Sequence, residues 1–233
     1  MLKAVFFDLD GTLLPMDQEL FIENYFVMLA KKLASFGLEP NALIKAITHA
    51  TEAMVRNNGV QTNEVVFWND YTKSFGPQAR SHETLFTDFY KKEFQKLKDI
   101  CGFNYKSAKI VRDLKESGVR IVLATNPIFP AIAMESRIRW AGLEPEDFEF
   151  YTSYENMSYC KPNLAYYREL LSRMRLSPHE CVMVGNDVGE DMVADQLGMK
   201  VFLMTENLIN QKNVDIDEFP HGDFDDLRDF LRD

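Results

Sequence analysis

Short apolar runs alternate with helix-like segments through most of this chain, and this alternation limits the possible folds more than any other feature. The apolar runs are residues 4–7, 119–124, 181–184 and 200–204. Each is short and continuous, as expected for a strand that is covered on both faces. Helical spacing is found in residues 105–117, 130–141, 163–174 and 189–198. Strands and helices in this order predict the α/β class, with a Rossmann-like parallel sheet and helices on both faces. The segment 148–152 predicts one more short strand.

Residues 17–98 interrupt this alternation, because they hold long stretches of helical spacing and no convincing strand. We expect a helical insertion of about four helices in residues 17–98, and a core made of residues 1–16 and 99–233. Glycine, asparagine and proline mark the expected turns of the insertion at residues 37–40, 57–59 and 76–77. Phe67, Trp68 and Tyr71 have helical spacing, and we expect them to pack inside this domain rather than against a substrate.

Composition excludes several classes of function. The net charge of −10 repels a phosphate backbone, so we expect no nucleic-acid partner. The sequence shows neither a long uncharged apolar run nor a secretion signal, which predicts a cytoplasmic protein without a membrane partner. Cys101, Cys160 and Cys181 are far apart and lack CxxC spacing, so neither disulfides nor a thiolate metal site is indicated. Nothing in the sequence indicates an oligomeric state.

Polar residues follow the predicted strands at the points where these strands end. Asp8 and Asp10 come after the first strand, and their side chains, two positions apart on extended chain, can face one cleft. The other candidates are Thr125, Asn126, Lys161, Asn186, Asp187 and Asp191. In open parallel sheets, ligands bind outside the carboxyl ends of the strands. We therefore expect these residues to converge on one ligand.

Four motifs occur in the order DLDGT at 8–12, Thr125-Asn126, Lys161-Pro162 and GNDVGED at 185–191. In this order the set resembles the haloacid dehalogenase (HAD) superfamily, and the helical insertion resembles the C1-type cap of that superfamily. The resemblance implies a Mg²⁺-dependent phosphohydrolase. Its substrate would be a small phosphorylated metabolite, a phosphomonoester that is cleaved through an aspartyl-phosphate intermediate.

The resemblance also implies a role for each residue. Asp8 would be the nucleophile, and Asp10 would protonate the leaving oxygen and later activate water. The phosphoryl group would be held by the Thr125 hydroxyl, the Asn126 backbone N–H and Lys161. Mg²⁺ would be bound by Asp8, the backbone carbonyl of Asp10 and one residue of 186–191.

The fourth motif departs from the family pattern, which commonly has aspartate directly after the glycine where this chain has Asn186. Counting from the glycine makes Asn186 the metal-facing residue, with Asp191 behind it. Counting back from Asp191 selects Asp187 instead. We favour Asn186, and Asp191 could also act only as a helix cap.

Electrostatics explain why such a site needs a cation. Two carboxylates about 4 Å apart repel by about 4 kcal/mol at an effective dielectric constant of about 20. Without compensation this would raise one pKa by about 3 units. Mg²⁺ and Lys161 together would keep Asp8 ionised, while Asp10 could stay protonated.

Other functions remain open at this point. A phosphomutase, a phosphonate hydrolase or a dehalogenase is possible within the same superfamily, although a dehalogenase needs no acid such as Asp10. A non-catalytic, receiver-like phosphate-sensing module is an alternative from another class, which the long insertion disfavours. For Arg56, Lys73, Arg80 and His82 of the insertion we expect surface positions rather than contacts with an anionic substrate.

Overall fold

A parallel sheet forms the centre of the computed structural model, which describes residues 2–232. Its six strands are β1 (Ala4–Phe7), β2 (Arg120–Leu123), β3 (Phe150–Tyr151), β4 (Cys181–Gly185), β5 (Lys200–Met204) and β6 (His221–Gly222). The strand order is β3-β2-β1-β4-β5-β6, and every pair is parallel. This is the order of a Rossmann-like sheet. The predicted fold class is therefore confirmed.

The register of the central strands aligns their carboxyl ends. Phe7 of β1 lies opposite Leu123 of β2 on one side and Val184 of β4 on the other. The residues that follow these three strands therefore begin at the same edge of the sheet. From β1 the chain adds β2 and β3 on one side, and it then crosses back to add β4, β5 and β6 on the other side of β1. The position between β1 and β4 is therefore the topological switch point, where such sheets bind ligands.

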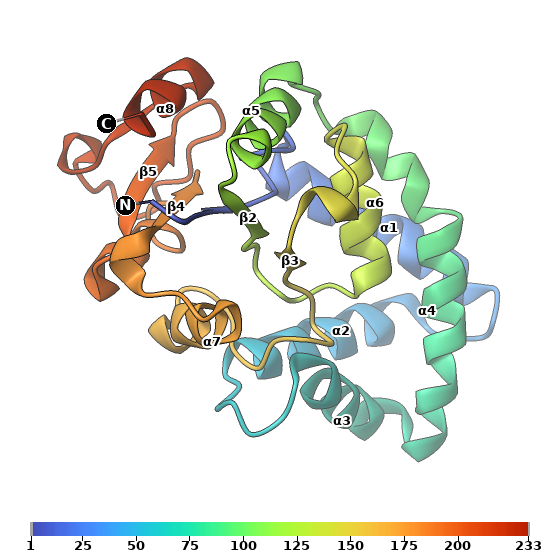
Figure 1. The fold of residues 1–233 in the computed structure, drawn as a ribbon. Coiled ribbons are helices and arrows are strands. Elements are labelled where there is room, and N and C mark those ends of the chain that lie inside the picture. The colour runs from blue at the N-terminus through green and yellow to red at the C-terminus, as the bar shows by residue number, and fades with distance from the viewer. Residues whose placement is uncertain (1, 233) are drawn as a thin grey trace.

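Helices cover both faces of the sheet (Figure 1). Helices α5 (Tyr105–Glu116), α6 (Ala131–Trp140) and α8 (Phe224–Phe230) pack in one apolar cluster with Val5 and Phe7. Helix α7 (Leu164–Met174) and the 3₁₀ helix η5 (Met192–Leu197) pack with Ala4 and Phe6, which point to the opposite face. Short 3₁₀ helices precede β3, β4 and β6, namely η3 (Pro145–Asp147), η4 (Pro178–Glu180) and η6 (Ile216–Glu218).

The helix predicted for residues 189–198 is shorter than expected and is η5. The reason lies in the preceding loop. The Asp187 carboxylate accepts the backbone N–H groups of Gly189 and Glu190, at 2.7 and 3.0 Å. This side-chain turn competes with the first turn of a helix.

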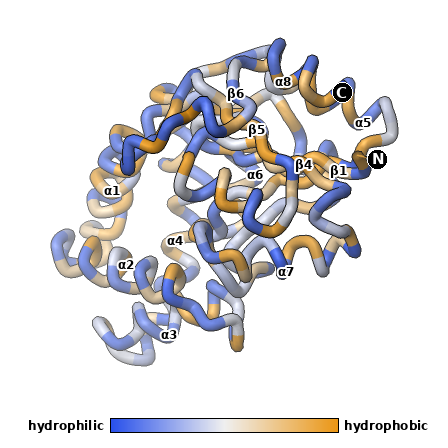
Figure 2. Tube along the Cα trace, turned by 90° about the vertical axis from the view of Figure 1, so that its left-hand side faces the viewer, coloured by the Kyte–Doolittle hydropathy of each residue, from blue (hydrophilic) through white to orange (hydrophobic). Residues whose placement is uncertain are grey.

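The inserted segment is helical, as predicted. It contains α1 (Gln18–Ala34), α2 (Pro40–Val55), α3 (Asn63–Phe75), η1 (Pro77–Ser81), α4 (His82–Lys91) and η2 (Phe94–Ile100). Asp17 caps α1 by accepting the backbone N–H of Leu20 at 3.0 Å. The chain turns between α1 and α2, α2 and α3, and α3 and η1 in the three segments where glycine, asparagine and proline predicted turns. Figure 2 shows α1 to α4 gathered on one side of the molecule, apart from β1, β4 and β5.

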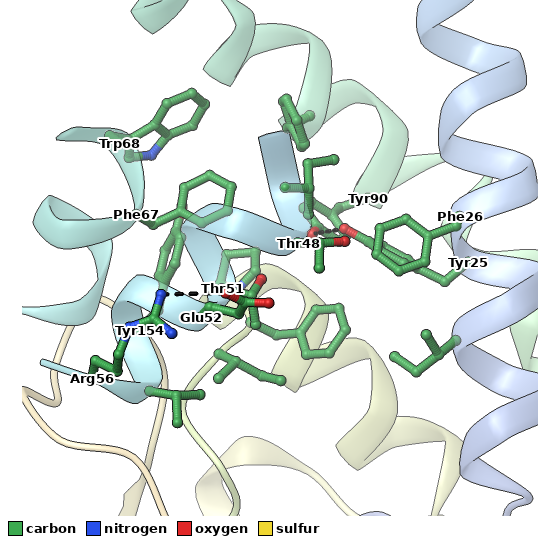
Figure 3. A pocket seen from close by; sticks show the side chains of 17 residues that line it. Tyr25, Phe26, Thr48, Thr51, Glu52, Arg56, Phe67, Trp68, Tyr90 and Tyr154 are labelled. Atoms are coloured by element: carbon green, nitrogen blue, oxygen red, sulfur yellow. Dashed lines mark hydrogen bonds and ion pairs between the residues drawn. The ribbon is translucent and has the colours of Figure 1, made fainter. Parts of the chain in front are cut away.

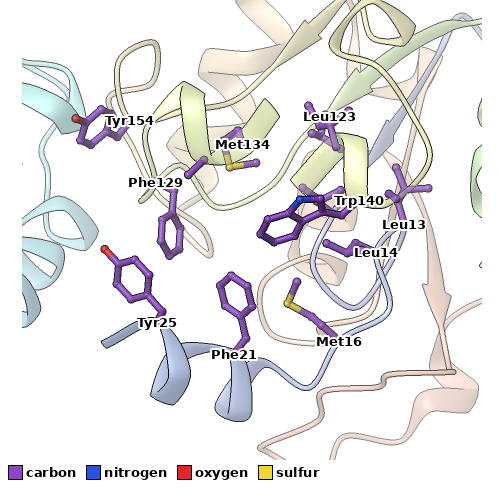
Figure 4. Packing of buried hydrophobic residues seen from close by; sticks show 14 of the residues in the cluster. Leu13, Leu14, Met16, Phe21, Tyr25, Leu123, Phe129, Met134, Trp140 and Tyr154 are labelled. Atoms are coloured by element: carbon purple, nitrogen blue, oxygen red, sulfur yellow. The ribbon is translucent and has the colours of Figure 1, made fainter. Parts of the chain in front are cut away.

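The insertion packs on the core through an aromatic interface. Tyr25 of α1 meets Phe129 edge to face, with ring centroids 5.4 Å apart. Phe21 of α1 lies on the same side, facing the loop that leads to α6 (Figure 4). Phe21, Tyr25 and Phe129 belong to one buried cluster that also contains Val5 and Phe7.

The boundaries of the cap at 17 and 98 stay a prediction, and residues 1 and 233 of the predicted core lie outside the described part.

Burial in the insertion follows the sequence pattern. Phe67, Trp68 and Tyr71 are buried, as expected for an interior.

The three cysteines lie outside the insertion. Cys160 and Cys181 are buried free thiols, and Cys101 is a half-buried free thiol. Within residues 2–232, no helix has the length and the apolar character needed to cross a membrane.

Candidate active site

A polar cleft of about 260 Å³ opens at the carboxyl ends of β1, β2 and β4. We call it the polar cleft and define it by the strand-end residues that line it. These are Asp8, Asp10, Thr125, Asn126, Asn186, Asp187 and Asp191. Seven of the eight residues that the sequence predicts for the site thus line one cleft at the switch point of the sheet.

Lys161, the eighth, lies buried behind the cleft in the loop before α7. Its Nζ donates to Asp8 Oδ1 at 3.0 Å and to Asp191 Oδ1 at 2.6 Å. Burial would lower the pKa of Lys161, but the two carboxylates outweigh it and hold the pKa well above its usual value. The lysine is therefore a fixed positive charge that joins the first and fourth motifs.

Gly185 makes room for this ion pair. A Cβ atom at this position would lie 2.0 Å from Asp191 Oδ2, far inside van der Waals contact. Asp191 Oδ2 in turn accepts the backbone N–H of Asp187 at 3.0 Å. Asp191 is thus an internal bridge between Lys161 and its own loop, and burial raises its pKa while Lys161 opposes this.

Asp10 is held by Arg137 of α6, which the sequence reasoning did not identify. Asp10 Oδ2 forms an ion pair with Arg137 Nη1, and the guanidinium lies over the Phe129 ring at 4.5 Å. Arg137 is only 1% exposed, whereas the Asp10 side chain is partly exposed to the cleft, so solvent reaches the pair only from the side of the carboxylate. Burial raises the pKa of Asp10, Arg137 opposes this, and the nearby Asp8 adds to the rise; the net pKa is above its usual value.

A signal for Arg137 was present in the sequence. Within helix α6, Arg137 shares the buried side with Ala133, Met134 and Ile138. An arginine in an apolar stripe needs a partner, because an unpaired buried charge is costly. The partner, Asp10, is 127 residues away in sequence, so only the fold identifies it.

Thr12 and Asn186 close the floor of the cleft. The Thr12 hydroxyl donates to Asn186 Oδ1 at 3.0 Å and lies 3.4 Å from Asp8 Oδ2. Asn186 Nδ2 donates to the backbone carbonyl of Asn207 at 2.6 Å, which fixes the amide orientation. Gly11 has φ of +86°, and a Cβ there would lie 2.3 Å from Asn186 Nδ2. The glycine of DLDGT is therefore required both by its backbone and by Asn186.

The wall after β2 is fixed by its backbone. The carbonyl of Thr125 accepts the hydroxyls of Thr152 and Tyr166, at 2.7 and 3.0 Å. Asn126 donates its side-chain amide to both oxygens of Glu190, at 3.0 and 3.1 Å. Burial raises the pKa of Glu190 to about 7. Glu190 also lines the cleft and is a second residue that the site prediction did not include.

The cleft could hold Mg²⁺ with oxygen ligands. Within residues 2–232, no three side chains of His, Cys, Asp or Glu gather in a metal-binding arrangement. Two of the expected ligand oxygens are amide oxygens: Oδ1 of Asn186 and the backbone carbonyl oxygen of Asp10. Amide oxygens are not part of a cluster of His, Cys, Asp and Glu side chains. The Asp10 carbonyl accepts Gln18 Nε2 at 3.0 Å and retains a second lone pair. Together with Asp8 Oδ2 these hard oxygens fit the preference of Mg²⁺.

The cations of the insertion do not reach the polar cleft. Arg56, Lys73 and Arg80 have exposed side chains that pair with carboxylates of the insertion. His82 is half-buried and contacts Tyr71, with Nδ1 and the phenol oxygen 3.1 Å apart. Surface or packing positions are therefore found for all four, and none lines the polar cleft.

The fold and this cleft together define an α/β enzyme whose candidate reactive groups are carboxylates at the switch point of a Rossmann-like sheet. A family model described as haloacid dehalogenase-like hydrolase matches residues 2–194. The chain belongs to this family of hydrolases, as the motifs predicted.

Relatives of this chain include a phosphatase. The glyceraldehyde 3-phosphate phosphatase of Methanothermobacter thermautotrophicus is 28% identical over 219 residues, which cover 89% of this chain and 88% of the relative. Among solved structures, a HAD phosphatase from Thermococcus onnurineus matches with a TM-score of 0.62 at 18% identity, over 99% of this chain and 98% of that one. A 2-haloacid dehalogenase from Pseudomonas syringae matches with a TM-score of 0.66 at 18% identity, over 100% and 99% of the two chains. At these identities the solved structures establish the fold alone.

Proposed function

We propose that this hydrolase is a Mg²⁺-dependent phosphatase that cleaves small phosphomonoesters through an aspartyl-phosphate on Asp8. The observation that carries this proposal is the position of Lys161 Nζ, 3.0 Å from Asp8 Oδ1 and 2.6 Å from Asp191 Oδ1. It joins motifs far apart in the sequence around one carboxylate that faces a cleft. The phosphatase activity in the name of the Methanothermobacter relative adds support.

In the first step, an Asp8 oxygen would attack phosphorus while the bond from phosphorus to the ester oxygen breaks. Asp10 would donate its proton to the departing oxygen, so that a neutral alcohol leaves. Arg137, which also lines the polar cleft, would position Asp10 through their ion pair. Arg137 binds Oδ2, while Oδ1 is buried and has no hydrogen-bond partner within residues 2–232, so the carboxyl group would have to rotate for Oδ1 to meet the departing oxygen.

In the second step, water would attack phosphorus, the bond to Asp8 would break, and Asp10 would take the proton of the water. Phosphoryl oxygens would be bound by the Thr125 hydroxyl, the Asn126 backbone N–H and the Lys161 ammonium group. Asp8, the Asp10 carbonyl and Asn186 would hold Mg²⁺, which when bound offsets the negative charge that Asp8 and the phosphoryl group bring together.

The inserted helices would act as a cap. Phe21 and Ile22 of α1 line the polar cleft together with core residues. A cap in this place would limit access of bulk water to the reacting groups. Its apolar contact with Phe129 supports a defined closed position.

The experiment is hydrolysis of a chromogenic aryl phosphate by the purified protein. Turnover should require Mg²⁺, stop on chelation, and resume when Mg²⁺ is added back. Asp8→Asn should abolish turnover, whereas Asp187→Asn, a change of the same kind in the same cleft, should retain part of it. Turnover that survives Asp8→Asn would contradict the proposed nucleophile, and a stable phosphoprotein without turnover would instead support a receiver-like function.

A further inference from the structure

A second cavity lies between the inserted helices and the core, next to the polar cleft. We call it the cap cavity; its volume is about 320 Å³. Its walls come from α1, α2, α3 and α4 and from the loops after β2 and β3 (Figure 3). A volume of this size is within the range of about 300 to 1,000 Å³ that is usual for pockets that bind small molecules.

The cap cavity and the polar cleft share a wall. Ile22, Ile128 and Phe129 line both of them. Phe129 is also the ring on which Arg137 stacks, at 4.5 Å, while Arg137 pairs with Asp10. The side of the cleft at which Asp10 would protonate the leaving oxygen is therefore the side that borders the cap cavity.

The walls of the cap cavity are mainly apolar, with eight aromatic residues among the 17 that line it, and the hydroxyls of Thr48 and Thr51 are the neutral aliphatic hydrogen-bonding groups among them. Phe67 and Trp68 of α3 meet edge to face at 5.3 Å, which fixes both rings. The hydroxyls of Tyr25 and Tyr90 bond to each other at 2.9 Å, so each already has a partner. These side chains surround the cavity in Figure 3. A sugar with several hydroxyls would lose more hydrogen bonds to water against these walls than the hydroxyls of Thr48 and Thr51 can replace.

The charged residues that line the cap cavity are exposed to solvent. Arg56 and Glu52 of α2 pair with each other at 3.3 Å, and both side chains are more than half exposed. Their charges compensate one another and are screened by solvent. The interior of the cavity therefore provides no cation for a second anionic group of a ligand.

We propose that the cap cavity binds the hydrophobic organic part of the substrate, an alkyl or aryl group attached to the phosphate that occupies the polar cleft. This inference rests on the proposed phosphatase function and names its substrate class. A short polar triose phosphate, such as the one named for the Methanothermobacter relative, would leave most of the apolar wall without contact. The preferred substrates are phosphate esters of medium-sized hydrophobic alcohols or phenols.

The test compares methyl, butyl and hexyl phosphate, whose leaving alcohols differ in size much more than in acidity. Burial of each methylene group should raise kcat/KM by about fourfold until the cavity is filled. The matching phosphonates, which cannot be hydrolysed, test binding separately from turnover. Hexylphosphonate should bind more tightly than methylphosphonate by a comparable factor for each methylene group.

Variants locate the effect in the cap cavity. Thr51 of α2 lines the cavity and is half-buried, so Thr51→Trp should fill part of it and bring the hexyl-to-methyl ratio of kcat/KM close to one. Ala42→Trp adds the same indole to an exposed position of α2 that does not line the cavity. This control should keep the ratio of the unmodified protein.

The outcomes separate the two proposals. Equal kcat/KM for the three esters, with equal binding of the phosphonates, would contradict the cap-cavity assignment and leave the phosphatase assignment intact. No turnover of any ester with Mg²⁺ would contradict the phosphatase assignment. The phosphonate series would in that case still decide whether the cavity binds hydrophobic groups.

Discussion

Arg137 of α6 forms an ion pair with Asp10 in the wall of the polar cleft, where the arginine is buried and the aspartate is largely buried. Breaking such a pair on one side leaves an uncompensated charge, which costs about 3 to 5 kcal/mol. We predict that Arg137→Met lowers the free energy of unfolding by this amount, and that it lowers kcat by about 10- to 100-fold because Asp10 loses its position.

A double-mutant cycle checks this prediction. Asp10→Asn in the Arg137→Met background should restore much of the stability, since the unpaired charge is then gone, and should not restore activity. Arg137→Lys should recover part of kcat, because it keeps the charge. Additive stability changes in the cycle would contradict the coupling of these two residues.

Gly185 is predicted to be required for the contact of Asp191 with Lys161. Gly185→Ala would place a methyl group 2.0 Å from Asp191 Oδ2 and push this carboxylate off the lysine. We expect kcat to fall by about 100-fold, since Lys161 would lose one of its two anchors. Gly189→Ala in the same loop is the comparison, because its Cβ would lie 3.3 Å from Asp187 Oδ1, and it should cost much less activity. An equal loss in both variants would argue against the specific contact.

Mg²⁺ dependence should distinguish the two candidate ligands of the fourth motif. Asn186 Oδ1 and Asp8 Oδ2 both approach the Thr12 hydroxyl, whereas Asp187 is engaged with the backbone N–H groups of Gly189 and Glu190. We therefore predict that Asn186→Ala raises the Mg²⁺ concentration for half-maximal activity by about 10- to 100-fold. Asp187→Asn should shift it less. Measuring the activity of both variants as a function of Mg²⁺ concentration tests this prediction. A larger increase in the half-maximal Mg²⁺ concentration for Asp187→Asn than for Asn186→Ala would identify Asp187 as the ligand instead.

The sequence alone was sufficient to predict the positions of the site residues that directly follow strand ends. Phe7, Leu123 and Val184 lie side by side in register, so residues that follow them must meet at one edge. The apolar runs predict this arrangement directly. Lys161 could be placed there only through its motif, because nothing local indicates that its ammonium group is buried between two carboxylates.

Other features depend on contacts that local patterns do not contain. Strand β6 has only two residues, His221 and Gly222, and forms because the chain passes along the edge of β5. The predicted helix over 189–198 is shortened by the Asp187 side chain, which binds the backbone where the helix would start. The cap cavity depends on the packing of α1 to α4 against Phe129, and the spacing within one helix cannot predict it.

Asp70 in α3 should make the stability of the insertion depend on pH. Burial would raise the pKa of this carboxyl, but hydrogen bonds from Lys73, at 2.7 Å, and from His49 outweigh it and lower the pKa below its usual value. A lowered pKa stabilises the folded state above the unfolded-state pKa of about 3.9, and this contribution is lost as the pH falls towards the folded-state pKa.

We expect Asp70→Asn to reduce the free energy of unfolding by about 1 to 3 kcal/mol at neutral pH. The difference from the unmodified protein should shrink as the pH falls below about 4. Denaturant unfolding at several pH values measures it, with Asp99→Asn, at an exposed position of η2, as the control. A difference that stays constant with pH would exclude the ionised carboxylate as the cause.

The most direct measurement for the whole account is the site of phosphorylation during turnover. Asp10→Asn should slow hydrolysis of the intermediate, because water loses its base, so a phosphoenzyme should accumulate with an activated aryl phosphate and Mg²⁺. After an acid quench, peptide mass mapping should find the phosphate on Asp8, and the Asp8→Asn/Asp10→Asn double variant should carry none. Phosphate on another residue, or a double variant that is still phosphorylated, would contradict the account.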